Sequence, residues 1–537
     1  MSYHQESFTS EEEAVLERFF SNTDRPVFAL MNMPEVVKGA LFARYSRSPK
    51  SIRRLFLDEF MADPDTGIAS IARQVAGDDP HVNLRKAETL YQRVFFEYGD
   101  DSVAQLGGTH LACEQASNIL TKVLEWGRLA AYLEQSTRYI YYDVRLGDRY
   151  RYHVPGELVG TPLGSEYLAL MENLFDTYSQ VVAAMTSAYE RRFPRQESDS
   201  NAVYASTIRA KACDAARGLL PAATLSNVGV YATGQAYEMA LVRMQSHPLF
   251  EVRSYGEMML TELRKVIPSF LTRVDRPDRG LRWSSYLADN VVALTELVPE
   301  PGSVEDRGPS VELTDWDPDA ELKVAAAALY AVSELSDRRL MELAAAMSVD
   351  ERHRVIAALI GARENRRHKP SRAMERTAYR FDVVCDFGAF RDLQRHRMLT
   401  IEWQKLSTRL GFDRPDDIVE EGFGSRWDDM MGATSRMYER IRSELGPDVA
   451  QYVVPFAYNL RFVMEMNPRE AFHLVELRSQ PAGHVAYRRI AQEMHRQIRD
   501  VAGHTAIADA MKFVDYSDVG LERLESERRA EQRRIRS

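Results

Sequence analysis

The chain has 537 residues, of which 45% are hydrophobic, so it can bury two sizeable cores. Its net charge of -10 disfavours nonspecific binding to nucleic acid, and no apolar run reaches the ~18 residues that a membrane-spanning helix needs. The three cysteines are far apart and form no C-x-x-C motif, so neither a disulfide framework nor a metal site is predicted. Together these features favour a cytoplasmic protein without nucleic-acid or membrane partners.

Helical periodicity dominates the chain, and only two short stretches are typical of strands. These are Ser136–Asp143 and Tyr379–Cys385, which are rich in β-branched and aromatic residues. Helix formers predict a helix over Glu321–Leu335, and Ser348 is expected to cap the next helix. Helices around small sheets predict an α+β fold.

One motif occurs twice, which indicates a tandem duplication. The stretches Glu125–Arg138 and Arg395–Arg409 each place a basic residue upstream of a Ser-Thr-Arg triplet. Each is followed by a proline, then an arginine, then a histidine; these are Pro221, Arg243 and His247 in the first repeat, and Pro455, Arg478 and His484 in the second. The Pro-, Gly- and acid-rich stretch 298–311 lies between the repeats. We therefore expect a first module at 1–295, a linker at 296–317 and a second module at 318–537, each helix-rich with a small antiparallel sheet.

These motifs resemble the signature of the flavin-dependent thymidylate synthases, Arg-His-Arg followed by Ser-x-Arg. The second repeat has Arg395, His396 and Arg397, with a spacer to Ser-Thr-Arg that is two residues longer than in the family. The first repeat keeps Glu-x-Ser-x-Arg, but has Trp126 and Gly127 where the family has arginine and histidine. The later Ala-Arg-x-x-Leu-Pro element is also matched in the first repeat. Each repeat thus keeps a part of the family signature that the other has lost.

The two repeats also depart from the family upstream of these motifs. The family's Gly-His-x-Ser-x-x-Glu-His appears in the first repeat as Gly99–Leu106, without either histidine. Family sites are assembled from several subunits, so a fused pair of modules can divide the binding residues between its halves. Two chains are accordingly expected to form a homodimer that imitates a four-module ring.

The resemblance implies the reductive methylation of dUMP to dTMP with FAD, NADPH and methylenetetrahydrofolate as co-substrate. The nucleotide would be bound by Glu134, Ser136, Arg138, Arg217, Arg243, Arg409 and Arg478, with Arg243 and Ser136 nearest the chemistry. The flavin would be bound by Arg128, Arg395, His396, Arg397 and Asn467. Arginine suits both tasks because its guanidinium stays charged and grips phosphate or a carbonyl bidentately.

Two alternatives remain open on the sequence alone. The protein could use flavin and folate to methylate another pyrimidine nucleotide, since the lost histidines could accompany a changed substrate. It could also be a catalytically inactive nucleotide-binding relative of the family.

Overall fold

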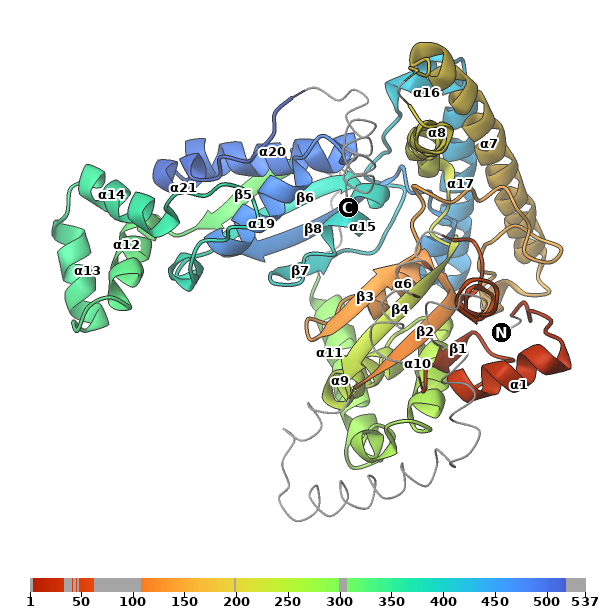
Figure 1. Ribbon diagram of the computed structural model, residues 1–537. Helices are drawn as coiled ribbons and strands as arrows, with labels where there is room; N and C mark the ends of the chain where they lie inside the picture. Colours follow the sequence, from red (N-terminus) through yellow and green to blue (C-terminus); the bar gives the residue numbers. More distant parts are fainter. Residues whose placement is uncertain are drawn as a thin grey trace. The chain divides into compact units, whose positions relative to one another are not determined.

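The computed structural model describes residues 3–32, 41, 45, 48–61, 108–197, 199–298 and 307–517 (Figure 1). The chain divides into two compact units, each with its own sheet. Unit 1 comprises Met1–Ala183, Leu219–Gly302 and Ser425–Pro455, and unit 2 comprises Ala184–Gly218, Ser303–Gly424 and Phe456–Ser537. Unit 1 is thus built mostly from the first half of the sequence but includes Ser425–Pro455 from the second half. Unit 2 is built mostly from the second half but includes Ala184–Gly218 from the first half. These structural units are not the same as the two sequence modules predicted at 1–295 and 318–537, whose boundaries stay predictions.

Unit 1 is built on a four-stranded antiparallel sheet of order β1-β2-β4-β3. The strands are Val27–Ala29 (β1), Gly108–Ser117 (β2), Ala130–Glu134 (β3) and Leu225–Thr233 (β4). Helices within this unit include α1 (Ser10–Phe19), α3 (Ile52–Leu55), α6 (Asn118–Leu124), α9 (Gly234–Gln245), α10 (Phe250–Leu263), α11 (Gly280–Leu297) and, from the second half of the sequence, α18 (Pro447–Ala450). The long helices α7 (Pro162–Arg192) and α17 (Gly424–Leu445) also belong mostly to it.

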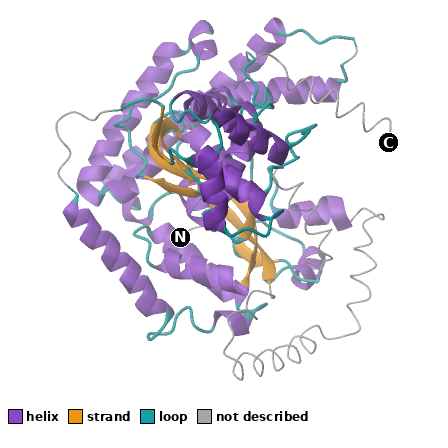
Figure 2. Ribbon diagram, turned by 90° about the vertical axis from the view of Figure 1, so that its left-hand side faces the viewer, coloured by secondary structure: helices purple, strands orange, loops and turns teal. Residues whose placement is uncertain are grey.

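Unit 2 repeats the same sheet, with order β5-β6-β8-β7. Its strands are Val311–Trp316 (β5), Tyr379–Asp386 (β6), Thr400–Trp403 (β7) and Asn459–Met466 (β8). Helices within this unit include α12 (Ala320–Tyr330), α13 (Asp337–Ala346), α14 (Val349–Ile360), α15 (Phe387–Leu393), α16 (Asp416–Glu420), α19 (Pro468–Arg478), α20 (Val485–Asp500), α21 (Thr505–Asp509) and, from the first half of the sequence, α8 (Asn201–Ala216). Helix prevails over strand among the described residues (Figure 2), and the α+β class with one antiparallel sheet per unit is confirmed.

Polar side chains begin the equivalent helices of the two repeats. Ser117 ends β2 and accepts a hydrogen bond from Leu120 N in α6, and Asp386 ends β6 and accepts one from Ala389 N in α15. Thr233 and Asn467 cap α9 and α19 in the same way. Each cap satisfies a backbone N–H that the first turn of a helix leaves unpaired. The duplication seen in the motifs is therefore also present in the strand-to-helix junctions.

The structure confirms most of the predicted local helices and strands but contradicts one of them. Tyr379–Cys385 is confirmed as β6, and Ser348 begins α14 with a capping box to Glu351. The predicted helix from Glu321 is confirmed as α12, although it ends at Tyr330. A strand over Ser136–Asp143 is wrong, because β3 precedes it and a turn follows at residues 137–139. Within the described residues, no helix has the length and apolar character needed to cross a bilayer.

Candidate functional site

Three arginines from three different segments surround one carboxylate in unit 2. The carboxylate of Asp392, at the end of α15, lies 3.6 Å from the guanidinium of Arg217, 3.7 Å from that of Arg395 and 3.9 Å from that of Arg478. Asp392 and Arg217 are buried, and Arg478 is mostly buried. The three cations outnumber the carboxylates of Asp392 and nearby Asp386, and Arg217 and Arg478 are largely withdrawn from water, which favours an anionic ligand. We call this group the arginine cluster.

The local fold explains how Arg395 and Arg478 reach the cluster. Helix α15 ends at Leu393, so the Arg-His-Arg triplet begins just beyond the helix end, where its side chains are freed from helical spacing. Arg395 is exposed and His396 is buried. Arg478 lies in the last turn of α19, and its Nη2 donates to the main-chain oxygen of Asp392.

Arg217 comes from the first repeat but lies in unit 2. It follows α8, and it is 3% exposed. Among the described residues, its Nη2 is buried without a hydrogen-bond partner, as is Oδ2 of Asp386. Buried polar atoms are normally paired, so an orphaned donor and acceptor in one region suit a ligand that supplies the complementary groups. Burial raises the pKa of Asp386 to about 6, and Arg217 opposes part of that increase.

Gly388 leaves space for both of these side chains. A Cβ atom at this position would lie 2.8 Å from Oδ1 of Asp386 and 3.3 Å from Nε of Arg217. Glycine therefore lets the guanidinium lie against the first turn of α15.

We expect Gly388→Ala to push the carboxylate of Asp386 from its bond to Ala389 N, because that oxygen is the closest contact of the new methyl group, and to crowd Arg217 beside it. If the arginine cluster binds the nucleotide that the sequence motifs imply, the affinity for dUMP should fall on the order of tenfold while the chain stays folded. Calorimetry on the purified variant measures this. Gly424→Ala is the matched control, since a Cβ there meets nothing closer than 3.6 Å; equal affinities for the two variants would contradict the assignment.

A hydrogen-bonded chain of side chains lies behind Arg478. Nε of Arg478 lies 3.0 Å from Nε2 of His396, and Nδ1 of His396 lies 3.0 Å from Oε1 of Glu470. His473, one helical turn beyond Glu470, places its Nδ1 3.3 Å from the same oxygen. The ligand atoms of His396, Glu470 and His473 all lie within 4.8 Å of one another. No sequence motif predicts a metal site here or points to Glu470 and His473, although their i,i+3 spacing on a helix is a readable signal.

The first repeat holds its corresponding arginine differently. Nη2 of Arg243 donates to the main-chain oxygen of Val123 at 3.1 Å, which parallels the bond from Arg478 to Asp392. The guanidinium carbon of Arg243 lies 4.1 Å from the ring centroid of Trp126. Gly127 stands where the second repeat has His396, so this position offers no imidazole. Arg243 belongs to unit 1 and Arg217 to unit 2.

The two Ser-Thr-Arg triplets form the same turn. Ser136 Oγ accepts from Arg138 N at 3.3 Å, and Ser407 Oγ accepts from Arg409 N at 3.4 Å. Arg138 is half-buried whereas Arg409 is exposed. Ser136 thus has a structural task in its turn, and its assignment to the chemistry stays a prediction.

Other predicted site residues interact with protein groups close to them in the structure. Glu134 is buried and pairs with Lys122 at 3.4 Å, and Lys122 also pairs with Glu125. Arg128 is exposed, and the side chain of Asn467 caps α19. The stretch Gly99–Leu106 lies outside the described residues.

His247 and His484 have matching structural roles. Their Nδ1 atoms accept from Leu249 N and Ala486 N, at the starts of α10 and α20. Neither histidine therefore needs a ligand to explain its position.

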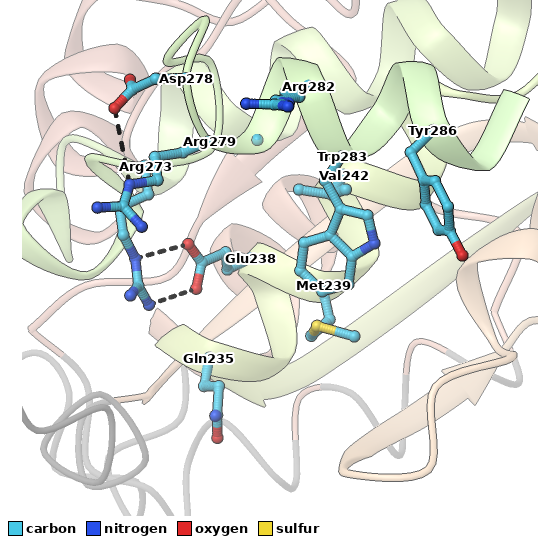
Figure 3. Close-up of a pocket in the computed structure, with 11 residues that line it drawn as sticks. Gln235, Glu238, Met239, Val242, Arg273, Asp278, Arg279, Arg282, Trp283 and Tyr286 are labelled. Carbon is cyan, nitrogen blue, oxygen red and sulfur yellow. Dashed lines mark hydrogen bonds and ion pairs between the residues drawn. The ribbon is translucent and has the colours of Figure 1, made fainter. Parts of the chain in front are cut away.

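Unit 1 has a separate cavity of about 590 Å³ between α9 and α11 (Figure 3). Trp283 and Tyr286 of α11 line it opposite Met239, and Arg273 forms two bonds with Glu238 at its edge. None of the residues predicted to bind nucleotide or flavin lines this cavity. It is thus distinct from the arginine cluster.

Comparison with known proteins matches the duplication. The family model described as "Thymidylate synthase complementing protein" matches residues 57–269 and again residues 312–503. A UPF0159 protein of Chlamydia muridarum is 39% identical over 529 residues, covering 97% of this chain and 98% of the relative. A UPF0159 protein of Thermoplasma acidophilum is 32% identical over 524 residues, covering 91% and 97%.

A more distant relative carries a name that describes an activity. The flavin-dependent thymidylate synthase of Clostridium tetani is 23% identical over 224 residues, which is 39% of this chain and 82% of that protein. It is similar in length to one repeat. With the family model matched in both halves, the chain belongs to the thymidylate synthase complementing protein family, as a tandem member.

Proposed function

We propose that the protein catalyses the flavin-dependent reductive methylation of dUMP to dTMP, with methylenetetrahydrofolate as carbon donor and NADPH as reductant. The observation that carries the proposal is the convergence of Arg217, Arg395 and Arg478 on Asp392. Family membership and the name of the Clostridium tetani relative support the reaction class.

Arg217 and Arg478 of the cluster would bind the phosphate and the pyrimidine carbonyls. Buried guanidinium groups hold such acceptors with charge-assisted bonds and need little reorganisation as negative charge develops on the ring. Among the described residues, the unpartnered Nη2 of Arg217 is one such donor. Arg138 and Arg243 remain proposed nucleotide contacts, and Arg409 a weaker one because it is exposed.

The proposed flavin ligands are Arg395, His396 and Arg397, with Arg128 and Asn467. Two guanidinium groups in the Arg-His-Arg triplet fit a diphosphate. The side-chain oxygen of Asn467 is already used at the start of α19, and both ring nitrogens of His396 are bonded to Arg478 and Glu470, so these two side chains would contribute less directly. When bound, reduced FAD supplies the electrons for the methylation. The protein then contributes binding, orientation and the exclusion of water.

Transfer of isotope from labelled methylenetetrahydrofolate to dUMP tests the proposal. We expect labelled dTMP to form only with NADPH present, and the purified protein to show flavin absorbance. Bound flavin and dUMP without label transfer would point to another pyrimidine. Nucleotide binding without bound flavin or label transfer would favour a catalytically inactive nucleotide-binding relative of the family.

A further inference from the structure

The second repeat holds Arg478 through a directional chain of hydrogen bonds. An arginine Nε–H only donates, so Nε2 of His396, 3.0 Å away, must present its lone pair. The proton of a neutral imidazole then lies on Nδ1, where it points at Oε1 of Glu470 at 3.0 Å. Both bonds therefore require the same tautomer of His396.

The protonation states of His396 and Glu470 agree with these hydrogen bonds. Burial lowers the pKa of His396 to about 4, so the imidazole is neutral at pH 7 and does not repel the guanidinium beside it. Burial alone would raise the pKa of Glu470, but the bonds from His396 and His473 lower it to about 2. Glu470 is therefore a carboxylate that accepts from both imidazoles.

We propose that Glu470 and His396 are positioning residues that fix the orientation of Arg478 toward the substrate. Glu470 selects the tautomer of His396, and His396 holds Nε of Arg478, while the main-chain oxygen of Asp392 holds Nη2. With Nε and one side of Nη2 anchored to the protein, the remaining N–H groups of Arg478 are directed by the fold. A guanidinium fixed in advance loses less freedom when it binds.

A metal ion at His396, Glu470 and His473 is the rival interpretation of the same side chains. Coordination through Nδ1 of His396 would put the ring proton on Nε2, facing the Nε–H of Arg478 at 3.0 Å. It would also place a dication close to a guanidinium. Two donors facing each other and two cations side by side both oppose the metal, so the hydrogen-bonded chain is favoured.

The first repeat supplies an internal comparison. Gly127 replaces His396, and Arg243 is stacked on Trp126 instead of being held by an imidazole. The positioning chain therefore belongs to the second repeat. This inference rests on the proposed function, because that function assigns Arg478 to the nucleotide.

A double-mutant cycle on Glu470 and Arg478 tests the proposal, with dUMP affinity of the flavin-loaded full chain as the readout. Glutamine at 470 keeps the shape but can pair with either tautomer of His396, so E470Q should weaken dUMP binding several-fold. In an R478A background the same substitution should have no further effect, because the residue that it positions is gone. Additive losses would overturn the proposal.

Two further measurements separate the possible failures. Glu465→Gln neutralises a half-exposed carboxylate of the same unit, which pairs with Arg380, and should leave affinity unchanged. Nitrogen NMR of the His396 ring should show Nδ1 protonated in the wild type and a mixture of tautomers in E470Q. This readout needs no nucleotide, so it holds even if dUMP proves not to be the substrate. Stoichiometric zinc binding by the wild type that E470Q abolishes, with Nε2 protonated, would instead establish the metal site.

Discussion

Arg217→Ala should reduce the affinity for dUMP by about 10- to 100-fold, although Arg217 belongs to the first repeat and the cluster around it to the second. The substitution removes a buried guanidinium whose Nη2 has no partner among the described residues. Hydrogen bonds to charged groups contribute about 1.5–3 kcal/mol, which corresponds to that range. It also leaves the carboxylates of Asp392 and Asp386 with less positive charge nearby. Calorimetry with dUMP on the flavin-loaded protein gives the affinity.

The second repeat provides a matched control for this experiment. Gln451 occupies the position that corresponds to Arg217, and its side chain donates to the main-chain oxygen of Asp448. Gln451→Ala should leave dUMP affinity nearly unchanged. Arg217→Lys should fall between wild type and alanine, because lysine keeps the charge but loses the planar fork. Unchanged affinity in Arg217→Ala would show that the nucleotide binds elsewhere.

Local sequence signals account for much of the fold. The capping box at Ser348 and the β-branched run at Tyr379–Cys385 are decided by neighbouring residues, and the structure follows both. The run at Ser136–Asp143 looks equally strand-like, yet the side chain of Ser136 bonds to the backbone of Arg138 and closes a turn. A serine that competes for backbone bonds outweighs the β-propensity of the aromatic residues after it.

The exchange of segments between the units could not be predicted in this way. It places Arg217 with Asp392, and Tyr452 with Glu251, through contacts between residues 175 and more positions apart. No periodicity or motif encodes such a pairing. Each repeat lacks motif residues that the other keeps, which suggested that the two repeats share the binding residues. This pattern could not show which residues lie in contact.

The arginine cluster was predicted only in part. Arg217, Arg395 and Arg478 carry the family motifs, so the sequence identified the cations. Asp392 and Glu470 stand at positions without a motif, and their importance depends on what the fold brings beside them. Electrostatic partners of this kind become visible only in three dimensions.

Glu251→Ala should be the most damaging of these substitutions for the stability of unit 1. Glu251 is 2% exposed and accepts hydrogen bonds from Ser117 N at 2.9 Å, Ser117 Oγ at 2.6 Å and Tyr452 Oη at 2.7 Å. Alanine would leave three buried donors without an acceptor. Each buried unsatisfied group costs about 1–3 kcal/mol, so we expect a loss of about 3 kcal/mol or more in the free energy of unfolding.

Tyr452→Phe isolates the contribution of the segment that unit 1 receives from the second half of the sequence. It removes one of the three bonds to Glu251 and keeps the ring in the core, where Tyr452 is 2% exposed. A loss of about 1 kcal/mol is expected, measured by denaturant unfolding beside the half-exposed control Glu465→Gln. If Tyr452→Phe were as stable as the control while Glu251→Ala unfolded readily, the carboxylate would act through Ser117 alone. In that case the segment Ser425–Pro455 would contribute no buried hydrogen bond to unit 1 at this point.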